Sequence, residues 1–431
     1  ALPILFKAQL RILPSVAFIS AFLNNTPVVV IFAPIIKHWA KSVNLPATKF
    51  LIPLSYVTIL GGICTLIGTS TNLVVHGMIL EAGFEGFSMF ELGKVGIFIA
   101  IAGIIYIFLF SKRLLPDARP DTAVPDEEVE EGEKLHRVEA VLGARFPGIN
   151  KKLKDFNFQR HYGAEVKEIK TRNGQRFVSN LEEVVLHEGD TLVVMADDTF
   201  IPTWGESSVF VLLTNGNEPD TTGKKKRWFA LLLLVLMIVG ATVGELPVTK
   251  EMFPDIKLDM FFFVSITTII MAWTNLFPAR KYTKYISWDI LITIACAFAI
   301  SKAMVNSGVA DSVAKFIIGL SDDYGPHVLL AMVFIITNLF TELITNNAAA
   351  ALAFPLALSI SAQLGVSPTP FFVVICMAAS ASFSTPIGYQ TNLIVQGIGN
   401  YKFTDFVRIG LPLNIITFLI SIILIPLIWN F

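Results

Sequence analysis

The chain has 431 residues, of which 54% are hydrophobic and 16% charged, and its formal net charge is -1. The mean hydropathy of +0.65 exceeds that of soluble globular proteins. The near-neutral charge leaves no basic footprint for nucleic acid, so no nucleic-acid partner is expected. The composition predicts an integral protein of the cell membrane, in contact with membrane lipid.

Polarity divides the chain into four consecutive segments. Residues 1–116 form an apolar first half, residues 117–136 an acidic linker, residues 137–223 a polar inserted domain with its own linker, and residues 224–431 an apolar second half. Several apolar stretches are long enough to cross a bilayer as helices: Val95–Leu115, Trp228–Gly244, Leu258–Phe277, Trp288–Val305, Val328–Ile344, Phe371–Ile398 and Ile409–Trp429.

The first half contains a polar motif that occurs again in the second half. Thr65–Gly77 and Thr385–Gly397 are identical at eight of thirteen positions. Each follows a polar tetrapeptide, Leu23–Thr26 in the first half and Ile344–Asn347 in the second, with a proline eight residues beyond it. Paired polar motifs inside two apolar halves predict an internal duplication of the kind found in secondary transporters.

The two halves differ in what precedes their motifs. Three apolar segments precede the second motif, whereas almost no apolar sequence precedes the first. If the halves are true repeats, we expect further N-terminal segments ahead of Ala1.

The inserted region has a different periodicity from the two apolar halves. Glu165–Ile169 and Thr191–Met195 alternate in polarity, and the turn signals Arg172–Gly174 and Glu188–Asp190 lie near them. Alternation with a period of two, interrupted by Gly and Asn, predicts short antiparallel strands. We therefore expect a small α+β domain between the two membrane halves.

Charged residues predict the membrane topology, because short cytoplasmic loops carry more Lys and Arg. Basic loops alternate with acidic ones such as Glu81 and Asp322–Asp323, which places the inserted domain in the cytoplasm. Each polar motif then begins in a segment that enters and leaves the membrane on the same side, as a re-entrant hairpin does. The predicted fold is an all-α polytopic membrane protein with inverted repeats and two re-entrant hairpins, and with a small α+β cytoplasmic domain between its halves. The basic residues used are Lys37, His38, Lys41, Lys112, Arg113, Lys224, Lys225, Lys226, Arg227, Arg280, Lys281, Lys284, Lys402 and Arg408.

Amides and hydroxyls gather at both expected hairpin tips. Such groups are costly in hydrocarbon and persist where they line a cavity or bind a ligand. Their oxygens suit Na⁺, whereas hydroxyls, amide N–H groups and helix N-termini suit an oxyanion. Gly68 and Gly388 allow each following helix to be interrupted. The alternative is helix packing through small and polar residues, which does not require matched pairs. The tip residues are Ser20, Asn24, Asn25, Thr26, Thr341, Thr345, Asn346 and Asn347.

Other polar residues give weaker signals. Glu342 is either a helix-pairing or gating carboxylate or a proton or ion site. His76 aligns with Gln396, which favours packing or hydrogen bonding over proton transfer. The three cysteines lie far apart in apolar segments, so disulfides and metal clusters are not expected. No catalytic constellation is present, and we expect a protein that is not an enzyme and needs no cofactor besides sodium as co-substrate.

At these motifs the chain resembles the divalent anion/sodium symporter family of the ion transporter superfamily. That family has Ser-Asn-Thr at each hairpin tip, where this chain has Asn24–Thr26 and Thr345–Asn347. The family's Thr-Pro-Pro-Asn corresponds to Thr69–Asn72 and Tyr389–Asn392. The double prolines are thus absent in both halves, and the side chains of Tyr389 and Gln390 are expected to narrow the cavity.

The resemblance implies a homodimer that works by an elevator motion. It implies one sodium site at Ser20, Asn24, Asn25 and Gly68, and a second at Thr341, Thr345, Asn346 and Gly388. It places the substrate between the tips, in contact with Asn25, Thr26, Thr69, Ser70, Asn346 and Asn347.

Residues 137–201 resemble a TrkA-C domain. The matching segments are Tyr162–Val166, Arg172–Gly174 and Glu188–Leu192, in that order and spacing. Such domains dimerise, and some bind small regulatory ligands. Members of the symporter family with this insertion are often sulfate transporters, so the resemblance favours sulfate or a related inorganic anion. The alternatives are a di- or tricarboxylate symporter of the same fold and a channel-like membrane protein gated by the TrkA-C domain.

Overall fold

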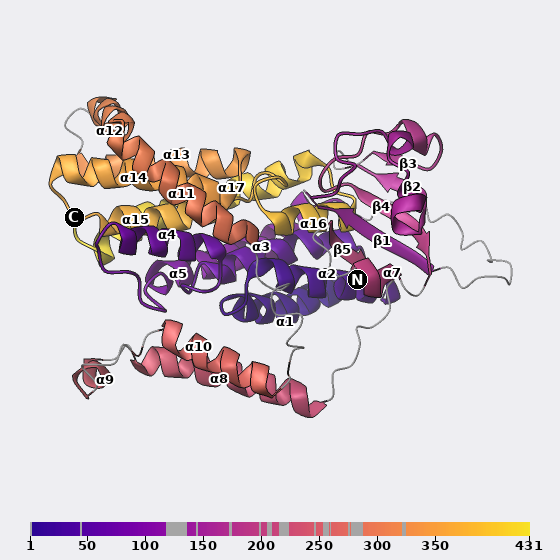
Figure 1. Cartoon of the computed structure of the whole chain (residues 1–431), viewed down its shortest axis with the longest axis horizontal. Coiled ribbons are helices and arrows are strands. Elements are labelled where there is room, and N and C mark those ends of the chain that lie inside the picture. Colours follow the sequence, from indigo (N-terminus) through magenta and orange to yellow (C-terminus); the bar gives the residue numbers. More distant parts are fainter. Residues whose placement is uncertain are drawn as a thin grey trace.

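A computed structural model shows two groups of helices, with a small β-sheet between them along the chain (Figure 1). The described residues are 2–43, 45–117, 136–143, 145–171, 175–197, 200–204, 209–214, 224–244, 247–252, 258, 260–274, 276, 288–320 and 325–431. Three features expected from the sequence fall outside these residues, namely the turn at Arg172–Gly174, the acid pair Asp322–Asp323 and most of the acidic linker.

The first half is a helical hairpin followed by an interrupted helix and a long helix. The hairpin is α1 (Leu2–Ser20) with α2 (Asn25–Ser42), and the short 3₁₀ turn η1 (Ala47–Lys49) leads to α3 (Leu51–Gly62). A break separates α3 from α4 (Ser70–Glu81), and α5 (Gly93–Leu114) completes the half. α3 is buried along its whole length, which agrees with its almost uniformly apolar sequence.

The second half repeats this order after additional helices. The additional helices are α8 (Lys224–Gly244), α9 (Pro247–Met252), α10 (Met260–Trp273), α11 (Trp288–Asn306) and α12 (Val309–Leu320). The repeated elements are the hairpin α13 (Gly325–Leu343) and α14 (Asn346–Leu364), the interrupted pair α15 (Thr369–Ser380) and α16 (Gln390–Gly399), and α17 (Phe403–Ile428). The stretch Phe371–Ile398, expected to cross the bilayer, is thus divided between two helices.

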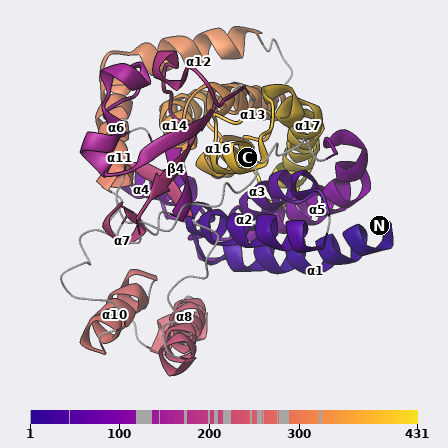
Figure 2. The same cartoon turned by 90° about the vertical axis from the view of Figure 1, so that its right-hand side faces the viewer.

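The two halves pack into each other rather than side by side. α2 packs on α16 of the other half, α14 packs on α4, and α5 packs on α17. α8 and α10 pair with each other beside this bundle (Figures 1 and 2). One continuous apolar core runs through both halves, including Leu60, Val75, Phe354 and Ile394. Because helices of one half pack on helices of the other half, the two polar motifs lie close together.

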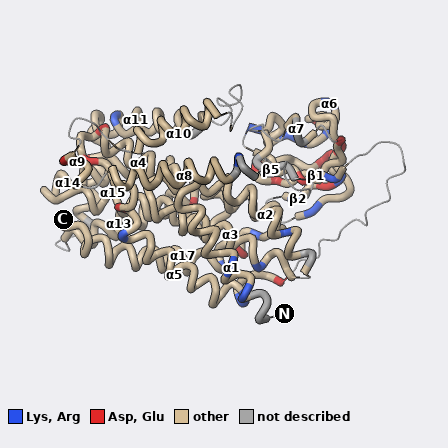
Figure 3. Tube along the Cα trace, turned by 90° about the horizontal axis from the view of Figure 1, so that it is seen from below, with Lys and Arg blue, Asp and Glu red and all other residues tan. Residues whose placement is uncertain are grey.

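Length and composition identify the helices that could cross a membrane. Within the described residues there are four, namely α5, α13, α14 and α17, and α11 with α12, bent by 71°, would make a fifth. The apolar parts of α8 and α10 are shorter, at Trp228–Gly244 and Met260–Trp273. Charged residues gather mainly on the sheet and near helix ends (Figure 3). This distribution is that of an integral membrane protein.

The polar region between the halves forms a five-stranded antiparallel sheet of order β3-β2-β4-β1-β5. Two of the strands occur where alternation predicted them, β2 (Glu165–Lys170) and β4 (Thr191–Ala196). A separate apolar core packs against the sheet. The other elements are β1 (His136–Leu142), η2 (Leu153–Asp155), α6 (Phe158–Tyr162), β3 (Arg176–Phe177), η3 (Leu181–Glu183), α7 (Phe200–Trp204) and β5 (Phe210–Thr214).

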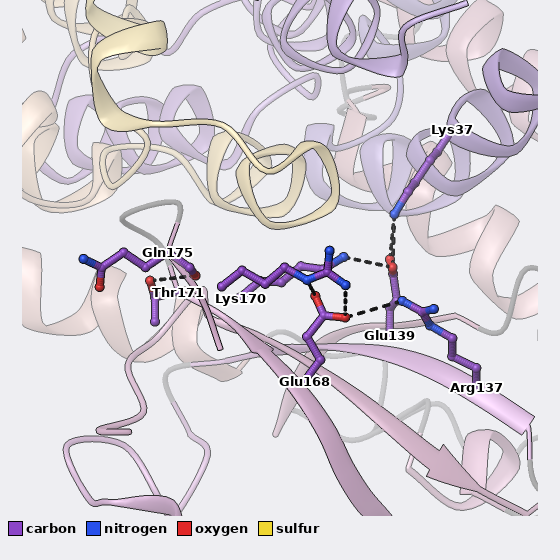
Figure 4. A network of polar contacts seen from close by, with 8 residues as sticks. Lys37, Arg137, Glu139, Glu168, Lys170, Thr171 and Gln175 are labelled. Atoms are coloured by element: carbon purple, nitrogen blue, oxygen red, sulfur yellow. Dashed lines mark hydrogen bonds and ion pairs between the residues drawn. The ribbon is translucent and has the colours of Figure 1, made fainter. Parts of the chain in front are cut away.

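The sheet contacts two helices that lead to the polar motifs. Glu139 of β1 pairs with Lys37 of α2 at 3.0 Å and with Lys170 of β2 at 3.3 Å (Figure 4). On α16, Gly397 lies so close to Thr191 that a Cβ atom at this glycine would overlap the threonine hydroxyl. The sheet therefore touches one helix from each half.

Acid is expected to weaken the Lys37–Glu139–Lys170 cluster. Burial alone would raise the pKa of Glu139, but the two ammonium groups outweigh it and lower the pKa to about 2. The folded state then binds fewer protons than the unfolded state between pH of about 4.5 and about 2, so stability falls as the pH drops through this window. Thermal unfolding should show that Glu139→Gln loses less stability there than the wild type, by about 1–3 kcal/mol.

Glu183 offers a matched control for this measurement. Lys152 and Lys154 also lower its pKa to about 2, but its side chain is 57% exposed. Because solvent and salt screen exposed pairs, Glu183→Gln should follow the wild-type acid profile. If Glu139→Gln and Glu183→Gln lose stability with falling pH to the same extent, the Lys37–Glu139–Lys170 cluster does not contribute to stability.

Candidate ion and substrate site

The break between α3 and α4 is held by hydrogen bonds from the repeated motif. Asn72 Nδ2 donates to the carbonyl of Thr65 at 2.9 Å. The Thr65 hydroxyl accepts from the backbone N–H of Gly68 at 3.1 Å and donates to the carbonyl of Ala21 in the first hairpin. The break and the hairpin tip are thus tied together.

The break between α15 and α16 is held in the same way. Asn392 Nδ2 donates to the carbonyl of Thr385 at 3.1 Å. The Thr385 hydroxyl accepts from the N–H of Gly388 at 3.3 Å and donates to the carbonyl of Glu342 in the second hairpin at 3.0 Å. The identical residues of the two motifs therefore perform identical structural tasks in the two halves.

Close approach of backbone explains the glycine in each break. A Cβ atom at Gly68 would lie 2.5 Å from the carbonyl oxygen of Gly62. At Gly388 it would lie 2.5 Å from the carbonyl oxygen of Thr341 and would also meet the Ser382 hydroxyl. Any side chain at either position would push the break away from its hairpin.

Each hairpin tip contains a buried hydroxyl–amide pair. Ser20 Oγ donates to Asn25 Oδ1 at 2.7 Å, and Thr341 Oγ1 donates to Asn346 Oδ1 at 2.9 Å. All four residues are at most 7% exposed. Both halves therefore offer a cluster of oxygen atoms beside an interrupted helix.

Two residues predicted as sodium ligands lie apart from these pairs. Asn24 and Thr345 are exposed at the start of α2 and α14. Asn24 Oδ1 accepts from the N–H of Thr26 at 3.4 Å, and Thr345 Oγ1 accepts from the N–H of Ala348 at 3.4 Å. Their side chains cap helices in this structure and take no part in the two hydroxyl–amide hydrogen bonds.

The N-termini of four helices, α2, α4, α14 and α16, meet across the two halves. Thr26 donates to Gln390 Oε1 at 3.3 Å, which joins the start of α2 to that of α16. Ser70 and Thr71 donate to Asn347 Oδ1 at 3.4 and 3.2 Å, which joins α4 to α14. Positive ends of helix dipoles attract anions, so four of them favour negative charge at this place.

The hydroxyl of Tyr389 lies at the centre of this arrangement. It accepts from Asn25 Nδ2 at 2.6 Å, is 3.0 Å from the Thr69 hydroxyl, and also hydrogen-bonds Asn346. Tyr389 is 9% exposed. One phenol therefore connects residues that were predicted for both sodium sites and for the substrate site.

The site has neutral donors and acceptors only. The hydrogen-bonding partners described above are amides, hydroxyls and backbone groups, and no Lys or Arg occurs among them. Within the described residues no three His, Cys, Asp or Glu side chains could hold a metal ion together. Such a site suits a cation that accepts uncharged oxygen ligands, or an anion held by dipoles.

Sequence reasoning assigned no direct role to Thr71 and did not place Tyr389 at the centre. Thr71 is identical in the two motifs, as Thr391, so the repeat itself was a signal. The position of the Tyr389 hydroxyl has no such signal, because it depends on the packing of one half against the other. His76 has the role predicted for it, since its Nδ1 accepts a hydrogen bond from the N–H of Phe87 at 3.0 Å.

Several known proteins that are similar to this chain are named as transporters. A family model described as citrate transporter matches residues 7–362 and 256–431. An uncharacterized transporter of Synechocystis sp. is 30% identical over 95% of this chain and 81% of its own length. An uncharacterized transporter of Escherichia coli is 25% identical over 99% of this chain and 85% of its own length. A sodium/sulfate cotransporter of Chlamydomonas reinhardtii is 31% identical over 65% of this chain and 31% of its own length.

Proposed function

Because the chain belongs to the citrate transporter family of membrane transporters, we propose that it is a sodium-coupled symporter of a divalent inorganic anion, with sulfate as the best candidate. The observation that carries the proposal is the meeting of four helix N-termini around the Tyr389 hydroxyl, between two buried hydroxyl–amide pairs.

The cation sites of this proposal are the two hydroxyl–amide pairs. Asn25 Oδ1 and Asn346 Oδ1 are buried oxygens beside breaks in which backbone carbonyls are not used by a regular helix. Oxygen ligands and unwound backbone at half-helix ends are typical of sodium sites in transporters. We place one sodium ion at Ser20, Asn25 and Gly68 and another at Thr341, Asn346 and Gly388, with Asn24 and Thr345 contributing as caps.

The anion site of this proposal lies between the tips. Asn25, Thr26, Thr69 and Ser70 approach it from the first half, and Asn346 and Asn347 from the second. Their neutral donors, together with the four helix dipoles, can bind a compact dianion. The positive charge of the sodium ions would offset the two negative charges of the anion, which explains how it could be bound without Arg or Lys.

Two observations bear on the choice of anion. The named sodium/sulfate cotransporter among the relatives favours sulfate. The contacts of the Tyr389 hydroxyl place its phenol beside Asn25 and Thr69, and we expect a ring at this position to favour a small anion over a dicarboxylate. The description of the matched family favours citrate, so a di- or tricarboxylate is the second candidate.

We further propose an elevator-type motion of inverted repeats with two re-entrant hairpins, in a homodimer. The duplicated order of elements supports the repeats, since each half has a hairpin, a break and a long helix. We propose that the sheet region is a TrkA-C-like cytoplasmic domain that regulates transport through its contacts with α2 and α16, without touching the substrate.

Uptake of labelled sulfate into vesicles that contain the purified protein tests the proposed function. We expect uptake driven by an inward Na⁺ gradient and little uptake when choline replaces Na⁺. Excess selenate, molybdate or thiosulfate should inhibit it, because these anions are also compact, whereas succinate and citrate should inhibit little. The reverse order of inhibition would assign the protein to carboxylate transport, and uptake independent of Na⁺ would contradict the coupling.

A further inference from the structure

The sheet turns a row of charged side chains towards the helical bundle (Figure 4). Glu139 of β1 and Glu168 of β2 lie opposite the same residue of β4, so both project from one face of the sheet. Lys170 of β2 and Thr191 of β4 lie opposite each other two positions further along, on that face too. The salt bridge between Glu139 and Lys37 of α2 shows that this face meets the bundle.

Positive charge exceeds negative charge in this row. Each of the two carboxylates is contacted by two cationic side chains, at distances from 2.5 to 3.6 Å. Four positive charges therefore meet two negative ones, and two are left over. Glu165, a further acid of β2, is paired with Lys167 at 2.7 Å. We call six side chains the sheet cluster: Lys37, Arg137, Glu139, Glu168, Lys170 and Arg176.

Lys170 is buried without a full set of hydrogen-bond partners. Its side chain is 4% exposed, and its one described partner is Glu139 Oε1 at 3.3 Å, an atom that Lys37 also binds, at 3.1 Å. Two of its three N–H groups thus have no acceptor among the described residues. Lys49 is buried as well, but it donates to two backbone carbonyls and pairs with Asp117 at 3.2 Å. A buried cation with so few partners is costly, which points to a missing acceptor at Lys170.

A buried hydroxyl lies on the strand next to Lys170. Thr191 faces Lys170 across the ladder, and such neighbours have Cβ atoms about 4.5–5.5 Å apart. Thr191 is 0% exposed, and its Oγ1 has no hydrogen-bond partner among the described residues. The side chains of Lys37 and Arg137 are 23% and 38% exposed, so one side of the cluster is open to solvent. Unused N–H and O–H donors and surplus positive charge therefore occur together at an accessible place.

We propose that the sheet cluster binds a compact oxyanion with two negative charges, such as sulfate or hydrogen phosphate, where the sheet meets α2. The anion accepts hydrogen bonds from Lys170, Lys37 and the Thr191 hydroxyl, and its two charges match the surplus of the cluster. It thereby links β2 and β4 to the helix that begins at Asn25. The inference goes beyond transport, because this site carries its own positive charge and needs no sodium ion.

A phosphate group on a lipid has the same chemistry as a free dianion, since it also presents oxygen acceptors and negative charge. The donors without partners decide between the two sources. Lys170 and Thr191 both belong to the sheet and are buried there, whereas only Lys37 comes from the bundle. We therefore assign the site to a free anion, and the experiment includes a lipid arm.

Equilibrium dialysis of the purified full chain with labelled sulfate tests the site. Choline replaces Na⁺, so that the anion site proposed at the hairpin tips lacks its sodium ions. We expect saturable binding that unlabelled phosphate competes for and that chloride at the same ionic strength does not. Lys170→Met, which keeps the Lys37–Glu139 pair, should raise the Kd about tenfold or more, because it removes a charged donor. Thr191→Val keeps the shape of the side chain and should raise the Kd less.

Lys154→Met is the matched control, because it removes a positive charge from the same domain at an exposed pair with Glu183. It should bind sulfate like the wild type, and thermal unfolding checks that each variant folds. If Lys170→Met fails to fold, Thr191→Val carries the test.

Three results would overturn the proposal. They are no saturable binding by the wild type without Na⁺, binding unchanged in both Lys170→Met and Thr191→Val, and equal weakening by Lys154→Met. Displacement of sulfate by phosphatidic acid vesicles as effectively as by phosphate would overturn the free anion in favour of a lipid phosphate. Because no transport is measured, each of these results leaves the proposed function standing.

Discussion

Replacing Asn25 and Asn346 together with alanine is expected to abolish sodium-dependent anion uptake while the protein still folds. Each substitution removes a buried oxygen from a hydroxyl–amide pair, and Asn25→Ala also removes the amide that donates to the Tyr389 hydroxyl. Losing a partner of this kind costs about 1–3 kcal/mol, so each single variant should need about ten to a hundred times more Na⁺ for half-maximal uptake.

The control for this experiment lies in the same hairpin. Asn24→Ala removes an exposed amide that only caps α2, and should change the Na⁺ requirement far less. Thermal unfolding of the double variant, compared with the wild type, checks that it folds. Unchanged Na⁺ dependence in the double variant, or an equally large effect of Asn24→Ala, would show that the cation sites are elsewhere.

The second large effect is expected at Tyr389. Tyr389→Phe removes the hydroxyl that Asn25 and Thr69 contact, yet keeps the ring. We expect the KM for sulfate to rise about tenfold, because buried polar groups lose a partner. Tyr389→Ala should in addition admit larger anions, so that succinate begins to compete with sulfate uptake.

The comparison of the two variants distinguishes hydrogen bonding from size. If Tyr389→Phe behaves like the wild type and only Tyr389→Ala changes selectivity, the ring alone matters. If neither variant alters affinity or selectivity, Tyr389 does not face the anion. Gln390→Ala is a useful comparison, because Gln390 is exposed and contacts only Thr26 among the hydrogen bonds described.

The repeated motifs made part of the fold predictable, including the two helix breaks around the candidate site. Identical residues such as Thr65 and Thr385, or Asn72 and Asn392, hold the breaks within their own halves, and these contacts span a few residues of sequence. The polar alternation likewise predicted β2 and β4. Short-range interactions of this kind are visible in a sequence because the chain itself sets their distances.

Contacts between the halves were not predictable in the same way. Tyr389 meets Asn25 across 364 positions of the chain, and Asn414 meets Glu342 across 72. Such contacts depend on how helices are packed, which periodicity does not specify. The exposure of Asn24 and Thr345 is a similar case, since a family motif gives residue types but not which side chains turn inward.

The attachment of the sheet to α2 and α16 has a thermodynamic consequence. Lys37, on the helix that begins at Asn25, pairs with Glu139 of the sheet. Gly397, on the helix that begins at Gln390, lies against Thr191 of the sheet. If occupancy of the sheet by any molecule alters ion affinity at the tips, then ions at the tips must alter that molecule's affinity by the same factor. Reciprocity of this kind would let the sheet report on the sodium concentration at the hairpin tips.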